Sequence, residues 1–134
     1  MDDFTLHRRL DAETSFVADW TLSRVQLMND SRYPWLVLVP RRMDRVELFD
    51  LSKPDRDLLM EEVALAAKRL KEMSGAAKIN IGALGNLVPQ LHLHVVARRP
   101  GDPAWPGPVW GHSPSVPYQP IARDAFIAKF LKVP

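Results

Sequence analysis

The sequence contains no cysteine. This absence excludes disulfide bonds, zinc sites with thiolate ligands and cysteine nucleophiles. It also agrees with a reducing compartment, so we expect a cytoplasmic protein. The N-terminus has no apolar signal core, and the longest apolar runs are far too short to span a bilayer. We therefore expect no membrane partner.

Long tracts of like charge are also missing. The 18 basic and 16 acidic residues are interspersed and give a formal net charge of +2. This pattern favours a small anionic ligand over a long nucleic acid. The 134 residues are 46% hydrophobic and 25% charged, an ordinary globular composition. The length predicts one domain, residues 1–134, with a single core.

The hydrophobic pattern of the first half predicts both strands and helices. A weak pattern indicates a short helix over 10–19. Strands are predicted over 21–28 and 35–39, and the polar turn between them makes a hairpin. The clearest helix begins after Ser52, which can cap its N-terminus, and ends at Gly75.

The second half adds two alternating strands, over 78–84 and 90–99. Seven of the twelve prolines lie between residues 100 and 120, which predicts a rigid loop. Residues 121–132 predict a short amphipathic helix. The fold class is therefore α+β, an antiparallel sheet with one long helix and a short C-terminal helix.

Two of the four histidines lie in "PQLHLHVV", residues 89–96. Strand alternation places Gln90, His92 and His94 on one face, with neighbours ~7 Å apart. A neutral imidazole can attack phosphorus if one nitrogen is held as N–H and the other keeps its lone pair. A neighbouring imidazole or amide can donate to a phosphoryl oxygen. The segment therefore indicates a phosphate-sized polar patch.

Other interpretations of these histidines remain open. His92 and His94 are equally compatible with the solvent-facing side of a half-exposed strand. A zinc site would need a third ligand, and His7 or His112 would have to be recruited from a distant segment.

Two asparagines near these strands also have two interpretations. Asn80 lies on the polar face of the adjacent strand, and Asn86 follows Gly85 in a turn. Each can contact a ligand or satisfy nearby backbone. Packing or solvent exposure is the default role for two tryptophans and two arginine pairs: Trp105, Trp110, Arg41–Arg42 and Arg98–Arg99.

The segment "NIGALGNLVPQLHLHVVARRP" resembles the signature of the histidine triad (HIT) family. In that signature, histidines alternate with apolar residues on a strand that follows a turn rich in small and polar residues. The "WLVLVPRR" strand and the "DLSKPDRDLL" start of the long helix follow the same order. The resemblance covers roughly residues 20–112. A Pro/Trp-rich loop and a short helix occupy residues 100–134.

The resemblance implies a HIT-like fold, a homodimer, and chemistry at the α-phosphate of a nucleotide. No cofactor is implied, although a divalent cation on the substrate is compatible with the scheme. His92 matches the nucleophile that forms a nucleotidyl-histidine, and His94 matches a phosphate contact. Asn80 matches a position that holds the ribose or orients the triad. Asn86 falls near the phosphate or leaving group, and Asp30 near the ribose-binding acid.

Two residues depart from the family pattern. Gln90 occupies the first triad position and cannot take up a proton near neutral pH. Trp35 stands where relatives often carry a further histidine. Related sugar-phosphate uridylyltransferases also have a mixed His/Gln triad, with the glutamine at the other end. We expect a hydrolase of a nucleoside phosphoramidate, dinucleoside polyphosphate or similar ester. Nucleotidyl transfer and a non-catalytic nucleotide-binding module are the alternatives.

Overall fold

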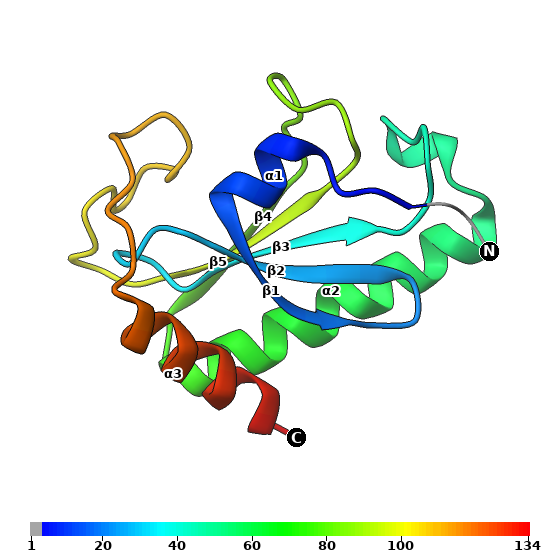
Figure 1. Cartoon of the computed structure of the whole chain (residues 1–134). Helices are drawn as coiled ribbons and strands as arrows, with labels where there is room; N and C mark the ends of the chain where they lie inside the picture. Colours follow the sequence, from blue (N-terminus) through cyan, green and yellow to red (C-terminus); the bar gives the residue numbers. More distant parts are fainter. Residues whose placement is uncertain (1–3) are drawn as a thin grey trace.

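Five antiparallel strands form a sheet in the order β1-β2-β3-β5-β4 (Figure 1) in the computed structural model, which describes residues 4–134. The strands are β1 (Thr14–Asp19), β2 (Ser23–Met28), β3 (Trp35–Pro40), β4 (Lys78–Gly82) and β5 (Leu93–Arg98). The helices are α1 (Arg8–Glu13), the 3-10 turn η1 (Leu48–Asp50), α2 (Lys53–Ser74) and α3 (Pro120–Lys132). This architecture confirms the predicted α+β class.

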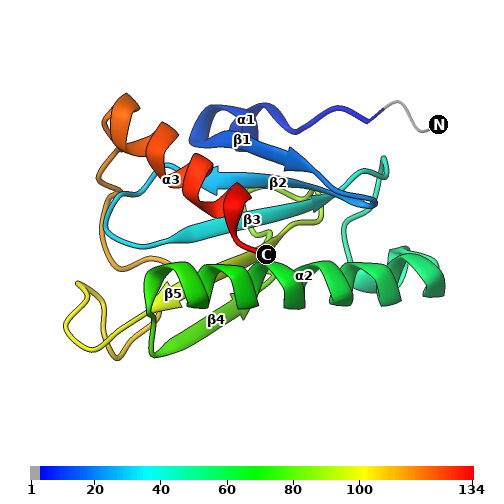
Figure 2. The same ribbon diagram turned by 90° about the horizontal axis from the view of Figure 1, so that it is seen from below.

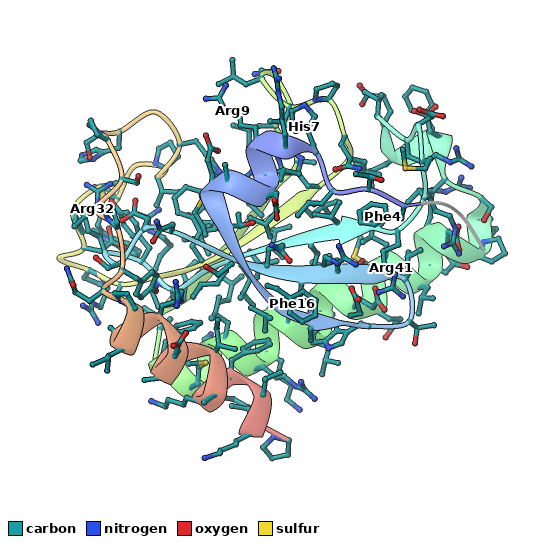
Figure 3. All side chains as sticks on the ribbon, in the orientation of Figure 1. Phe4, His7, Arg9, Phe16, Arg32 and Arg41 are labelled. Atoms are coloured by element: carbon teal, nitrogen blue, oxygen red, sulfur yellow. The ribbon has the colours of Figure 1, made fainter. Side chains whose placement is uncertain are left out.

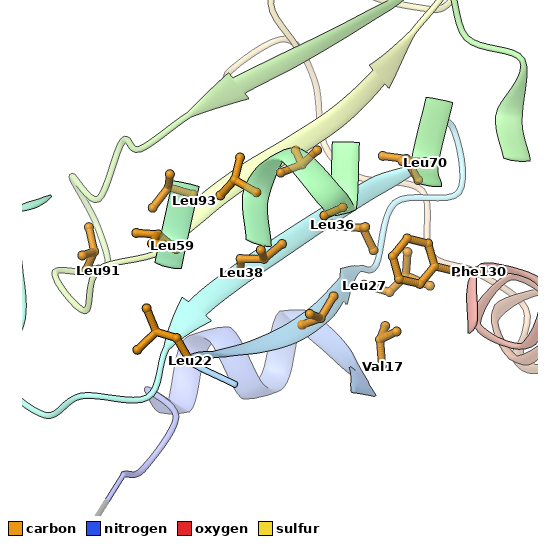
Figure 4. Close-up of a cluster of buried hydrophobic side chains, with 14 of the residues drawn as sticks. Val17, Leu22, Leu27, Leu36, Leu38, Leu59, Leu70, Leu91, Leu93 and Phe130 are labelled. Atoms are coloured by element: carbon orange, nitrogen blue, oxygen red, sulfur yellow. The ribbon is translucent and has the colours of Figure 1, made fainter. Parts of the chain in front are cut away.

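The two faces of the sheet have different cover. Helices α2 and α3 lie on one face (Figure 2) and pack against its leucines. Figure 4 shows part of this cluster: Leu36, Leu38, Leu59, Leu70 and Phe130. The opposite face packs against α1 and loop residues through a second cluster that includes Leu10, Trp35, Val37, Val96 and Val109. Strands β3 and β5 are buried on both faces because they are covered from both sides.

Helix α2 has the predicted ends. The Ser52 hydroxyl accepts a hydrogen bond from the Asp55 amide at 3.3 Å. Gly75 ends the helix with φ of 67°, a left-handed conformation that favours glycine. Within residues 4–134, no helix combines the length and apolarity needed to cross a bilayer.

Two element predictions need correction. The helix predicted over 10–19 ends at Glu13, and Thr14–Asp19 is strand β1, paired with β2. This segment contains Thr14, Phe16 and Val17, residue types that favour strands. The strand predicted from residue 90 begins at Leu93. The Leu91 amide donates to the Arg45 carbonyl instead of a neighbouring strand, so His92 lies just before β5.

Arg98 is buried, contrary to the solvent-exposed default for its pair. Its side chain is 1% exposed and donates to both Asp102 carboxylate oxygens, at 2.7 and 2.9 Å. A further N–H donates to the Asn80 side-chain oxygen at 2.9 Å. Through these bonds the Arg98 side chain connects β5 to β4 and to the start of the proline-rich loop.

Candidate functional site

A cleft of about 640 Å³ opens on the sheet face that carries α1. We call it the main cleft. Its size lies within the range of small-molecule sites. The predicted site residues that line it are Asp30, Asn86, His92 and His94, together with Trp35 and Trp110. The structure thus brings four of the six predicted site residues together around one hollow.

The backbone carbonyl of Gln90 holds the neutral His92 ring in one tautomer. Its Nδ1 lies 2.7 Å from the Gln90 carbonyl oxygen. A carbonyl only accepts, so Nδ1 carries the hydrogen and Nε2 keeps a lone pair. Within residues 4–134, no side chain or backbone group hydrogen-bonds to this Nε2. The ring therefore has the form that nucleophilic attack requires.

Trp35 fixes the tautomer of His94. The Trp35 indole N–H donates to His94 Nδ1 at 3.0 Å, so the His94 hydrogen lies on Nε2. Burial, with a smaller contribution from nearby His92, lowers the pKa of His94 to about 3. His94 is therefore neutral at pH 7. Its Nε2–H can donate a hydrogen bond to an anion but does not supply a proton.

Trp110 completes this wall of the main cleft by packing. Its ring meets His94 and Trp35 edge-on, with centroid distances of 5.6 and 6.4 Å. A Cβ on Gly82 would lie 3.1 Å from the Trp110 ring, so glycine permits the close approach. Sequence reasoning assigned Trp110 to packing but missed the hydrogen bond from Trp35 to His94.

The Gln90 side chain faces the N-terminal segment instead of the main cleft. Its oxygen accepts from the His7 amide at 2.8 Å, and its nitrogen donates to the Thr5 carbonyl at 2.9 Å. Figure 3 shows His7 at the start of α1. The oxygen and the nitrogen of the Gln90 amide both hydrogen-bond to backbone groups. The structure does not test a contact between Gln90 and phosphate.

The remaining predicted residues are divided between the cleft and the sheet. Asn86 lines the main cleft, whereas Asn80 bonds to Arg98 and does not line it.

Asp30 is 2% exposed, and Arg32 donates to both its carboxylate oxygens. Burial raises the pKa of Asp30, but the hydrogen bonds from Arg32 and from backbone amides outweigh it and hold the pKa below its usual value. Asp30 is therefore ionised at neutral pH.

No group of three His, Cys, Asp or Glu side chains in residues 4–134 is arranged to hold a metal ion. The histidines that a zinc site would have to recruit have other neighbours. His7 Nδ1 accepts from the Arg9 amide at 3.0 Å, and His112 Nδ1 lies 2.9 Å from the Ser113 hydroxyl.

Comparison with known proteins identifies the family. The sequence profile of the HIT domain matches residues 9–101, more than half of the chain. The chain belongs to the HIT family.

Solved structures of HIT proteins share the whole fold. A histidine triad protein from Sinorhizobium meliloti is 47% identical with a TM-score of 0.97, and the match covers 98% of each chain. One from Bradyrhizobium japonicum is 45% identical with a TM-score of 0.95 over 97% of each chain. One from Marinobacter aquaeolei is 43% identical with a TM-score of 0.95, over 97% of this chain and 95% of that one. No curated protein sequence matches significantly.

Replacing Trp35 with Phe is expected to release the His94 ring from its single tautomer. The aromatic packing stays, but the N–H donor to Nδ1 is lost. Nitrogen-15 NMR of the imidazoles should then show an Nδ1–H form that the wild type lacks. We also expect a loss of about 1–3 kcal/mol in the free energy of unfolding, because a buried acceptor loses its partner. An unchanged His94 tautomer in W35F would show that the indole does not set it.

Proposed function

We propose that this protein is a hydrolase that acts at the α-phosphate of a nucleotide through a nucleotidyl-His92 intermediate. The observation that carries this proposal is the hydrogen bond from His92 Nδ1 to the Gln90 carbonyl. It leaves Nε2 with a lone pair beside a cleft large enough for a nucleotide. The HIT domain match supports the same chemistry by family likeness.

The reaction has two steps in this proposal. His92 Nε2 forms a bond to phosphorus, and the leaving group departs with the electron pair of its own bond. The imidazole then carries a positive charge, which the Gln90 carbonyl stabilises through Nδ1–H. Water next attacks phosphorus, the N–P bond breaks, and the nucleoside monophosphate leaves. The scheme requires no metal, although a divalent cation on the substrate is compatible with it.

The binding roles follow from where each side chain lies and which partners it has. His94 Nε2–H and the Asn86 amide would donate to phosphoryl oxygens. The Asp30 carboxylate, whose two oxygens already accept from Arg32, would meet a ribose hydroxyl through a further lone pair. For Gln90 and Asn80, whose amides already have partners, we propose orientation only. Gln90 would act through the backbone carbonyl that holds His92.

A homodimer is also part of the proposal. Strand β4 lies at an edge of the sheet, and its Ile81 is 51% exposed. An edge strand with an exposed apolar side chain favours pairing with a second copy. Nucleotidyl transfer and nucleotide binding without turnover remain the alternative functions.

A panel of adenylylated and guanylylated compounds tests the function. We expect release of the nucleoside monophosphate, and an adduct on His92 after quenching without acid, because an N–P bond is labile in acid. Intact-protein mass spectrometry followed by peptide mapping would detect the adduct. Tight nucleotide binding with no release from any compound would contradict hydrolysis and indicate the binding module. Release without a His92 adduct would contradict the covalent route.

A further inference from the structure

The two residues that precede His92 lie outside the sheet. Strand β5 begins at Leu93, so in residues 4–134 the ladder hydrogen bonds that hold a strand in place do not reach Gln90 or Leu91. The Gln90 carbonyl nevertheless fixes the His92 ring through a 2.7 Å hydrogen bond to Nδ1. The orientation of that ring therefore depends on the contacts that hold residues 90 and 91.

Hydrogen bonds from two distant segments hold these residues. The Gln90 side-chain nitrogen donates to the Thr5 carbonyl at 2.9 Å, and its oxygen accepts from the His7 amide at 2.8 Å. The Leu91 amide donates to the Arg45 carbonyl at 2.8 Å. Two of these three bonds come from residues 5–7, which we call the N-terminal segment.

The bonds to Thr5 and His7 resemble one rung of a parallel sheet, in which a residue bonds to a carbonyl and to the amide two positions later. A carboxamide carries its acceptor and its donor side by side on one carbon, so the Gln90 side chain reaches both groups. The two ring nitrogens of a histidine point away from each other, and one imidazole at this position would reach only one of the groups. Glutamine therefore matches the backbone of the N-terminal segment.

The N-terminal segment is itself attached to the rest of the protein. Figure 1 shows it as the dark blue trace that leads into α1. Phe4 and Leu6 pack against the hydrophobic cluster on the α1 side of the sheet. The Thr5 amide donates to the sulfur of Met43 at 3.4 Å, and the His7 imidazole caps the N-terminus of α1. An anchored segment of this kind can hold Gln90 in a fixed place.

From these contacts we infer that the N-terminal segment is a positioning element for His92, and that Gln90 is the positioning residue that connects the two. The bonds to Thr5 and His7 keep the Gln90 carbonyl within reach of His92 Nδ1, so that Nε2 keeps its lone pair beside the main cleft. The inference rests on the proposed function, in which His92 is the nucleophile. It extends that function to residues 5–7, which are not among the residues that line the main cleft.

Gln90→Leu tests the connection, because it removes both hydrogen bonds and keeps a side chain of similar size. The probe is the 4-nitrophenyl ester of adenosine monophosphate. We expect kcat to fall at least ~10-fold, as when a group that orients a reactive residue is lost. KM should change by less than about threefold, because the lining of the main cleft is intact. A kcat within about twofold of wild type would overturn the inference.

Gln119→Leu is the matched control for this variant. It makes the same replacement at an exposed glutamine before α3, whose side chain makes no capping hydrogen bond. Its kcat should stay within about twofold of wild type.

Gln90→His separates positioning from proton transfer. The new ring can take up a proton but can make only one of the two hydrogen bonds. Positioning predicts that kcat falls by about fivefold or more. An unchanged or higher kcat would overturn the inference, since the bonds to the N-terminal segment would then not limit the reaction.

A pair of variants at His7 tests the same connection from the backbone. His7→Ala and His7→Pro both remove the imidazole that caps α1, but only proline also removes the N–H that donates to Gln90. The φ of −53° at His7 is one that proline adopts. We expect kcat of His7→Pro to be about fivefold below that of His7→Ala. Equal values in the two variants would overturn the inference.

Nitrogen-15 NMR of the His92 ring follows its tautomer without a substrate. We expect one Nδ1–H form in the wild type and a mixture of tautomers in Gln90→Leu. If the wild type releases nucleotide from no compound and forms no adduct on His92, the proposed function fails, and the NMR comparison still decides whether the N-terminal segment positions the ring. If the wild type releases nucleotide with a His92 adduct but Gln90→Leu changes neither kcat nor the tautomer, only this inference fails.

Discussion

His92→Ala is expected to reduce nucleotide release by at least ~10³-fold, because the proposed nucleophile is lost. Binding of adenosine monophosphate should change by less than about tenfold, since the remaining cleft contacts are intact. Steady-state release assays give the first quantity and titration calorimetry the second. The variant keeps Leu91 and Leu93, which face the helix-covered core, so we expect it to fold.

His112→Ala is the matched control. It removes the same side chain from an exposed loop position, where the ring contacts Ser113. Its rate should stay within about twofold of wild type, as for most surface substitutions. Loss of activity in both variants alike, or residual activity within tenfold in His92→Ala, would contradict a nucleophilic role for His92.

Asp102→Ala is expected to destabilise the fold by about 3–5 kcal/mol. The change leaves the Arg98 guanidinium buried without its carboxylate partner. Chemical denaturation with urea measures the free energy of unfolding directly. Asp124→Ala is the control, since it breaks the Arg123–Asp124 pair at the surface and should have an effect below about 1 kcal/mol. Equal losses in the free energy of unfolding would show that the buried ion pair stabilises the fold no more than the surface pair does.

The same pair predicts a response to acid. The Arg98 guanidinium holds the pKa of Asp102 below its usual value. As the pH falls, the unfolded chain therefore takes up a proton at Asp102 before the folded one does. The stability that this carboxylate contributes is fully present above its unfolded pKa and declines below it. Asp102→Ala should lose that part of the acid dependence.

Regular alternation in the sequence predicted which side chains of residues 91–95 face the core and which face the other side of the sheet. Leu91, Leu93 and Val95 face the helix-covered core, while His92 and His94 line the cleft on the other side. Helix α2 was predictable because its cap, its apolar spacing and Gly75 are all local signals. Strand β1 was missed because its pairing with β2 outweighs a weak helical pattern.

The partners of the polar side chains were not predictable in the same way. The Gln90 amide hydrogen-bonds to His7 and Thr5, which lie 83 and 85 positions away in the sequence. Trp35 hydrogen-bonds to His94, which lies 59 positions away. Such contacts depend on how strands and loops are brought together, which periodicity does not encode. The resemblance to HIT proteins indicated which positions matter but not that Asn80 and Gln90 bond elsewhere.

The attachment of Gln90 to Thr5 and His7 has a practical consequence for work with the purified protein. The backbone of residues 5 and 7 steadies the residue whose carbonyl fixes the reactive ring. Affinity tags and truncations at the amino end therefore act close to His92, the proposed nucleophile. In the described chain, helix α3 lines neither the main cleft nor the cavity beside residues 46–49. A carboxyl-terminal fusion after α3 therefore avoids that disturbance.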